Sequence, residues 1–249
     1  MIVRREQVEA FREPMQSAYV KSAADHMSRY DPVLAEAAGR GQVEKAAVAG
    51  LEAARRHQLS AGPGLQLYLE LMMSLGSEFD SDPQYSWLEP FLEPRDDVGS
   101  VERARFLHFH AVAYLGRTRG TRNAHSRVAL DRALEFLTRL RISDMKNEAQ
   151  PEQLLGWLHP QRLDFIEPKA YAAVVASARS TAAEARLAAP NGTNLLLLLL
   201  LLFGTKAAAD PLYPWIGQNL GGPGEAASRW ENLAGTAGDY IGRVIRSIG

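Results

Sequence analysis

Histidines and carboxylates are the side chains of this sequence that could bind a metal or support catalysis. The six histidines are His26, His57, His108, His110, His125 and His159. No two of them have the four-residue spacing with an intervening glutamate that is typical of zinc hydrolases. His108 and His110 are two residues apart, so a helix would point them to different faces, which suits one metal ion poorly. We expect neither a metal nor another cofactor.

The segment Asp80-Ser81-Asp82 is similar to the start of a calcium-binding loop. The sixth position of such a loop is a glycine that permits a sharp turn, and here that position is Tyr85. We therefore interpret the segment as a loop that leads into a helix cap.

Motifs of several large enzyme classes are absent from the sequence. There is no nucleophile elbow, Walker loop or dinucleotide fingerprint, and the glycine clusters at 62–64 and 221–224 follow no predicted strand. A glycosidase needs two carboxylates across a cleft, one of them with a raised pKa, and the sequence places no such pair. We predict no catalytic residue. The alternative is a helical hydrolase whose acidic residues converge only in the fold.

Nucleic-acid binding is a second possibility for the arginine-rich residues 101–146. Phe106, Phe109 and Tyr114 lie in this stretch and could stack on bases. However, the net charge of the chain is -1, without the strongly basic footprint of a dedicated nucleic-acid binder. The three aromatic residues also have the spacing of core residues on a helix. We expect no nucleic-acid partner.

The elements that must position any site are helices, organised around the run Leu195–Leu202 and Phe203. This run has no polar face, so protein must cover it on every side. A helix of about ten residues is about 15 Å long, against about 30 Å for the hydrocarbon core of a membrane, which favours a buried core helix. Strand patterns are nearly absent. We predict an all-α multi-helix bundle around this helix.

An internal duplication is predicted at an offset of 128 residues (204 minus 76), covering residues 41–92 and 169–220. Each aspartate of the matched motif is a good N-cap, and the proline after it suits the first position of a helix. We expect each copy to start a short helix here, with its tyrosine and tryptophan packed on the preceding apolar helix. The matched residues are Gly76, Asp82, Pro83, Tyr85 and Trp87 in the first copy and Gly204, Asp210, Pro211, Tyr213 and Trp215 in the second.

We predict one all-α domain, 1–249, made of two related halves. The first half is 1–100, a basic helical connection is 101–150, and the second half with a C-terminal helix is 151–249. Helices are expected over 4–30 with a kink or break at Pro14, and over 43–58, 65–75, 101–115, 124–142 and 225–247. Loops are expected at 61–64, 116–120, 143–151 and 221–224.

Charge changes sign sharply along the chain. Residues 64–100 contain eight acids against Arg95 alone, whereas residues 101–146 contain ten lysines or arginines against four acids. The two blocks could pair with each other across the fold, or one of them could steer a charged partner to the surface.

The cellular compartment is predicted from features that the sequence lacks. The chain has no cysteine, its N-terminus MIVRREQVEAF is charged where a secretory signal would be apolar, and no segment is long enough to cross a membrane. We expect a cytoplasmic protein without membrane association.

Three features of residues 1–92 suggest a family: Glu6-Gln7-x-x-x-Phe11, then an alanine-rich helix, then Leu67-x-Leu69-x-Leu71 leading to Gly76-x-x-Phe79-Asp80-x-Asp82-Pro83. This region resembles small helical proteins encoded beside type VI secretion spike and toxin genes in Gram-negative bacteria. The resemblance implies an immunity, adaptor or chaperone protein that binds a toxin or spike protein and performs no catalysis.

Our sequence-based hypothesis is a non-enzymatic protein that binds another protein, such as a basic secreted toxin or spike protein. The contact is expected in the acidic segment, because complementary charge speeds and orients docking. The alternatives are the helical hydrolase and an architectural subunit of an oligomer. The residues expected at the contact are Glu70, Glu78, Asp80, Glu89, Glu93, Asp96 and Asp97.

Overall fold

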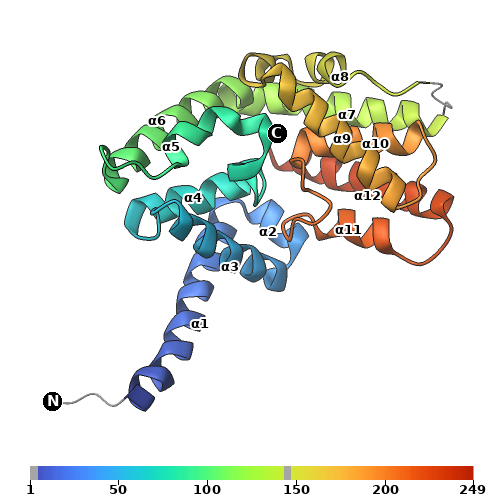
Figure 1. Ribbon diagram of the computed structural model, residues 1–249. Helices are drawn as coiled ribbons and strands as arrows, with labels where there is room; N and C mark the ends of the chain where they lie inside the picture. Colours follow the sequence, from blue (N-terminus) through green and yellow to red (C-terminus); the bar gives the residue numbers. More distant parts are fainter. Residues whose placement is uncertain (1–4, 143–146, 249) are drawn as a thin grey trace.

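The computed structural model describes residues 5–142 and 147–248, and within these ranges it contains helices and no strand (Figure 1). This confirms the prediction of an all-α multi-helix bundle. The α-helices are α1 (Arg5–Tyr30), α2 (Pro32–Ala38), α3 (Arg40–Arg56), α4 (Gly62–Leu75), α5 (Glu89–Leu92), α6 (Ser100–Arg119), α7 (Ala124–Ile142), α8 (Pro151–Leu158), α9 (Pro168–Glu184), α10 (Asn191–Phe203), α11 (Pro214–Gly221) and α12 (Ala226–Ser247). Short 3-10 helices are η1 (Phe79–Ser81), η2 (Pro83–Leu88), η3 (Thr121–Asn123) and η4 (Pro160–Phe165).

The leucine-rich helix α10 lies in the interior, as predicted. Each leucine from Leu195 to Leu201 is at most 1% exposed, and Leu202 alone in the run is partly exposed. Helices α7, α8 and α9 pack around it. Burying a leucine side chain is worth roughly 1.5–3 kcal/mol, so this helix is a major source of stability. None of the described helices combines the length and the hydrophobicity that crossing a membrane requires.

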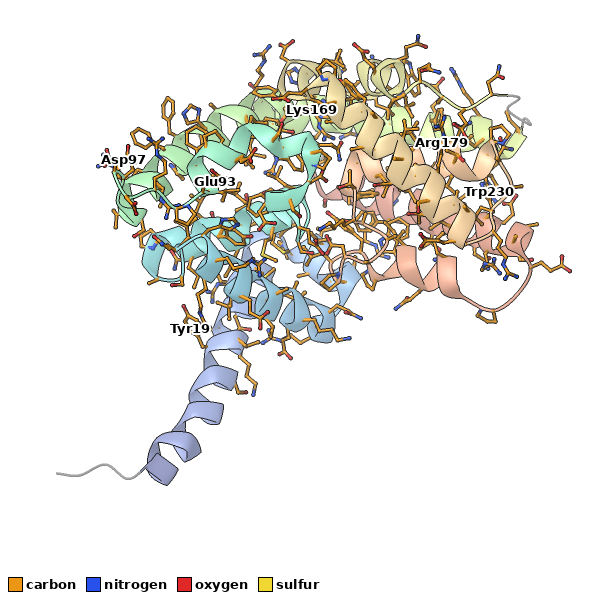
Figure 2. The ribbon with its side chains drawn as sticks, viewed as in Figure 1. Tyr19, Glu93, Asp97, Lys169, Arg179 and Trp230 are labelled. Carbon is orange, nitrogen blue, oxygen red and sulfur yellow. The ribbon has the colours of Figure 1, made fainter. Side chains whose placement is uncertain are left out.

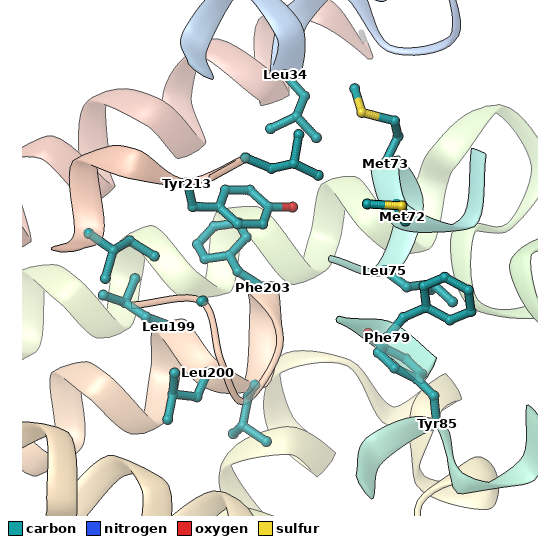
Figure 3. Close-up of a cluster of buried hydrophobic side chains, with 14 of the residues drawn as sticks. Leu34, Met72, Met73, Leu75, Phe79, Tyr85, Leu199, Leu200, Phe203 and Tyr213 are labelled. Atoms are coloured by element: carbon teal, nitrogen blue, oxygen red, sulfur yellow. The ribbon is translucent and has the colours of Figure 1, made fainter. Parts of the chain in front are cut away.

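The helix α4 is a milder counterpart of α10. Tyr68, Leu69 and Met72 are buried, but Leu67 and Glu70 remain partly exposed. The C-terminal ends of α4 and α10 approach each other in the core, where Leu75 and Phe79 lie on one side and Phe203 and Tyr213 on the other (Figure 3). The core therefore contains residues from both predicted halves.

Backbone conformations agree at several positions that are 128 residues apart. Gly76 ends α4 with φ 104°, and Gly204 ends α10 with φ 103°. Gln58 and Arg186 both adopt the left-handed region, with φ 57° and 54°. The two segments differ further on, because Pro83 begins η2 whereas residues 211–213 form a turn before α11. The expected helix start at Pro211 is therefore wrong, and the duplication over its full length remains a prediction.

Two expected helix boundaries are also wrong. Helix α1 continues through Pro14, so of the kink or break expected there the break is absent, and its N-terminal part projects from the rest of the molecule (Figure 1). Residues 62–64 form the first turn of α4, since Pro63 needs no backbone hydrogen bond there. Helix α6 continues to Arg119 and ends at Gly120, whose φ is 70°, so residues 116–119 are helix and not loop. Of the loop expected at 143–151, residues 143–146 lie outside the described part.

The motif aromatics pack differently in the two segments. Tyr213 and Trp215 contact Phe203 at the end of α10, with ring centroids 4.8 and 6.0 Å apart, as predicted. Tyr85 and Trp87 instead contact Tyr114 of α6, at 6.2 and 4.8 Å. Helix α4 ends in Leu75 where α10 ends in Phe203, and α6 supplies the aromatic ring in this half.

Candidate protein-binding surface

An exposed apolar stripe runs along one side of α6. Val101 is 76% exposed, Phe106 47%, Phe109 68% and Val112 54%. Their spacing of three to five residues keeps them on one side of the helix. Our expectation that Phe106 and Phe109 are core residues is wrong, although Tyr114 is buried. Contiguous exposed apolar side chains mark interaction surfaces more often than scattered ones do.

Three residues of this stripe, Val101, Phe106 and Phe109, line one wall of an apolar groove. The groove has a volume of about 850 Å³ and lies between α6 and the start of α4. Leu59, Pro63 and Leu67 line the opposite wall, and Phe106 and Phe109 line the α6 wall. Two walls of apolar side chains at this spacing can receive the apolar face of another helix.

Arg103 holds α6 in place from the buried side of the helix. It is 2% exposed, and its guanidinium donates to the carbonyl oxygens of Leu92 at 2.9 Å, Glu93 at 3.2 Å and His57 at 2.9 Å. These carbonyls belong to the ends of α3 and α5, so one side chain ties three helices together. The groove is therefore formed before any partner arrives.

An acidic rim, which we define as Glu89, Glu93, Asp96 and Asp97, extends from the start of α5 into the segment before α6. All four are exposed, and Figure 2 shows Glu93 and Asp97 on this side of the molecule. Asp97 pairs with Arg95 at 2.7 Å. Among the described residues, no ion pair joins a carboxylate of 64–100 to a lysine or arginine of 101–146. Within the described residues the two charge blocks therefore do not pair directly, and the rim faces solvent.

The other three predicted contact residues are held by the protein itself. Glu70 accepts from His26 on α1 at 3.1 Å. Glu78 pairs with Lys206. Asp80 accepts from His57 at 2.9 Å and from Tyr68 at 2.8 Å. The seven predicted acids therefore do not form one surface. Asp96 and Asp97 come shortly before Ser100 and Val101, which line the groove, whereas Glu89 and Glu93 line a different pocket together with Asp80.

His57, Tyr68 and Asp80 form a network that the sequence did not reveal. The Nδ1 atom of His57 lies 3.1 Å from the carbonyl oxygen of Leu92, and its Nε2 atom lies 2.9 Å from Oδ2 of Asp80. Burial alone would raise the pKa of Asp80, but the hydrogen bonds from His57 and Tyr68 outweigh it and the pKa lies below its usual value. A general acid needs the opposite shift. This network ties α3 and α4 to η1, and it is suited to structure rather than to acid catalysis.

The motif aspartates each accept two backbone amides. Asp82 accepts from Gln84 at 2.9 Å and from Thr205 at 2.7 Å. Asp210 accepts from Leu212 at 2.8 Å and from Ser77 at 2.8 Å. The local caps were predicted, whereas the bonds to the distant half were not.

Metal binding has little geometric support in the described part of the chain. No group of three or more histidine, aspartate or glutamate side chains is placed there to hold a metal ion. His110 stacks on Phe91 with ring centroids 4.3 Å apart, and both His108 and His110 line the apolar groove.

Comparisons of this chain with protein-family models, with curated proteins and with solved structures give no match.

Proposed function

We propose that this protein acts by binding another protein in the groove between α4 and α6, without catalysis. The observation that supports this is the exposed stripe of Val101, Phe106, Phe109 and Val112 on a helix whose opposite side is firmly anchored. Covering apolar surface stabilises a complex by roughly 25 cal/mol per Å² before the costs of association. Two exposed phenylalanines are therefore the main expected contributors to affinity.

The occupant we propose is an amphipathic helix with basic residues at one end. Its apolar face would lie between α4 and α6, and its basic end would face Glu93, Asp96 and Asp97. Opposite charges would speed and orient docking. Following the resemblance of residues 1–92, we propose a basic secreted toxin or type VI spike protein as the partner, with an immunity or adaptor role for this chain.

The test starts from a photo-crosslinking amino acid at Phe109, which identifies the partner and the peptide that contacts the groove. The affinity of the purified partner is then measured for wild type and for the double variant Phe106→Ser/Phe109→Ser. We expect at least tenfold weaker binding with an unchanged circular dichroism spectrum, because both rings are exposed. Ile142→Ser is the matched control, since Ile142 is 78% exposed at the end of α7.

The acidic rim is tested separately by the triple variant Glu93→Lys/Asp96→Lys/Asp97→Lys. Slower association and a weaker salt dependence are expected, with a small change in dissociation. Unchanged affinity in the phenylalanine variant would reject the groove. An equal loss in Ile142→Ser would point to non-specific adhesion. Stable homo-oligomers at low concentration that dissociate in the phenylalanine variant would favour the architectural subunit instead.

A further inference from the structure

A second cavity lies near the centre of the molecule, away from the groove. Its volume is about 380 Å³, and it is bordered by the ends of α4 and α10 and by α6, α7, α12 and η4. Tyr213 is one of the residues that line this cavity, and its ring lies between Phe203 and Leu34 (Figure 3). The polar side chains that matter for its chemistry are Arg119, Arg162, Tyr114, Tyr213 and Tyr240.

Arg162 brings a buried positive charge to the cavity wall. It is 5% exposed, and its guanidinium donates to the carbonyl of Leu201 at 2.6 Å and to the amide oxygen of Gln84 at 3.1 Å. Its Nε is buried without a hydrogen-bond partner. No carboxylate of the described residues lies within 4.0 Å of this guanidinium. Buried charges are normally paired, because an unpaired one costs several kcal/mol.

Arg119 is a second cation among the residues that line the cavity. It is partly buried, and its side chain makes no ion pair or hydrogen bond to another described residue. Asp31 is the one acid among the residues that line the cavity, and its Oδ1 accepts from Leu34 to cap α2. Burial and the neighbouring charge of Arg162 lower the pKa of His159 to about 4, so this histidine is neutral near pH 7. The two arginines therefore give the cavity a positive character.

We infer that this cavity binds a small organic anion, in which a carboxylate or phosphate group is attached to an apolar ring. Planar guanidinium groups match the oxygens of such anions, and the hydroxyls of Tyr213 and Tyr240 add donors at the wall. Leu75, Phe203 and Val244 offer apolar contacts to the ring. The volume is in the range of small-ligand pockets. This binding is independent of the protein-binding groove.

The experiment uses the full chain and four probes: benzoate, phenyl phosphate, inorganic phosphate and the neutral benzamide. Calorimetric titration and thermal unfolding are measured for each probe. We expect benzoate or phenyl phosphate to bind at least tenfold more tightly than benzamide and than inorganic phosphate, and to raise the melting temperature. The tighter of the two ring anions identifies the carboxylate or the phosphate as the preferred group.

Variants then locate the binding. Arg119→Gln should weaken binding of the preferred anion at least tenfold with the fold intact, because this side chain is partly exposed. Arg127→Gln on α7 removes the same charge from the exposed surface and should leave the affinity unchanged. Tyr240→Phe is the second cavity variant and should also weaken binding of the preferred anion, because it removes a hydroxyl donor from the cavity without changing its charge. Equal binding of benzamide, unchanged affinity in Arg119→Gln and Tyr240→Phe, or no binding of any anion at millimolar concentration would overturn the inference.

Discussion

Asp82 and Asp210 form reciprocal hydrogen bonds between the segments that follow α4 and α10. Asp82 accepts from the backbone amide of Thr205 at 2.7 Å, and Asp210 accepts from that of Ser77 at 2.8 Å. Both carboxylates are only 6% exposed, and both also cap their own segment. Each aspartate therefore accepts the backbone amide that directly follows the glycine at the end of the other apolar helix. Asp210 accepts from Ser77, which follows Gly76, and Asp82 accepts from Thr205, which follows Gly204.

Replacing Asp210 by asparagine should destabilise the protein. A single amide oxygen cannot replace both carboxylate oxygens, so one of the buried amides of Ser77 and Leu212 loses its acceptor. We expect the free energy of unfolding to fall by about 1–3 kcal/mol, measured by urea denaturation. Asp96→Asn on the exposed rim is the control and should change it by less than about 0.5 kcal/mol. Equal urea denaturation midpoints for Asp210→Asn and Asp96→Asn would contradict this role of the Asp210 hydrogen bonds.

Gly76 should not tolerate alanine. Its φ is 104°, which side chains rarely adopt, and an added Cβ would lie 2.9 Å from the carbonyl oxygen of Phe203. Gly76→Ala should therefore lower the free energy of unfolding by more than about 1 kcal/mol. Gly116→Ala is the matched control, because Gly116 lies within α6 with open space around it. This second change should be neutral or stabilising by up to about 1 kcal/mol, and the opposite order would show that the approach of α4 and α10 is not tight.

Arg103→Met should loosen α6. The substitution leaves the carbonyls of His57, Leu92 and Glu93 without their shared donor, at a cost of about 2–4 kcal/mol. Hydrogen exchange of α6 amides should become faster than that of α10 amides. Arg105→Met, on the exposed side of the same helix, should leave both exchange rates unchanged. Uniformly faster exchange in both helices would mean that Arg103 stabilises the whole fold and not this helix in particular.

Acid should destabilise the fold in part through His159. Burial, with a contribution from Arg162, lowers the pKa of His159 to about 4 from its usual 6.5. Between these values the unfolded chain binds a proton that the folded protein does not, so stability falls as the pH falls through this range. The pKa difference corresponds to about 3 kcal/mol.

Replacement of His159 by glutamine should remove this part of the pH dependence. The free energy of unfolding is measured by urea denaturation at about pH 7 and about pH 4.5, and we expect the variant to lose less stability between them than wild type. Asp80, whose lowered pKa also makes its contribution sensitive to acid, is present in both proteins and cancels in the comparison. If the free energy of unfolding changed equally with pH in wild type and in His159→Gln, a neutral, buried His159 would be contradicted.

The burial of α10 could be predicted from the sequence, whereas the exposed side of α6 could not, and the difference has a physical reason. A helix that is apolar on every side is buried whichever way it turns, so Leu195–Leu202 could be placed from composition alone. In α6, apolar residues occupy two sides of the helix: Leu107 and Tyr114 face inward, while Phe106 and Phe109 face outward. Their spacing cannot tell which side meets α4, because that depends on how distant segments pack.

The buried arginines had no local signal either. Arg103 and Arg162 donate to backbone carbonyls that lie far away in sequence, including Leu201, which is 39 residues from Arg162. A carbonyl is present in every residue, so no residue type marks the partner. The local hydrogen bonds of Asp82 and Asp210 were predictable because the amides that they accept lie two residues away, although only Asp82 caps a helix. The sequence shows that residues 64–100 are acidic, but it does not show that Glu70, Glu78 and Asp80 each have a partner within the protein.

The crosswise bonds of Asp82 and Asp210 make the two ends of this chain depend on each other for folding. A fragment that ended before α8 would keep the amide of Ser77 but lack its acceptor, and the complementary fragment would keep Thr205 without Asp82. Each piece carries what the other is missing. Cleavage at residues 147–150 should therefore yield two polypeptides that fold poorly when they are separate. When they are mixed, they should recover the native helices, so the cleaved protein can be used to measure assembly of the two fragments.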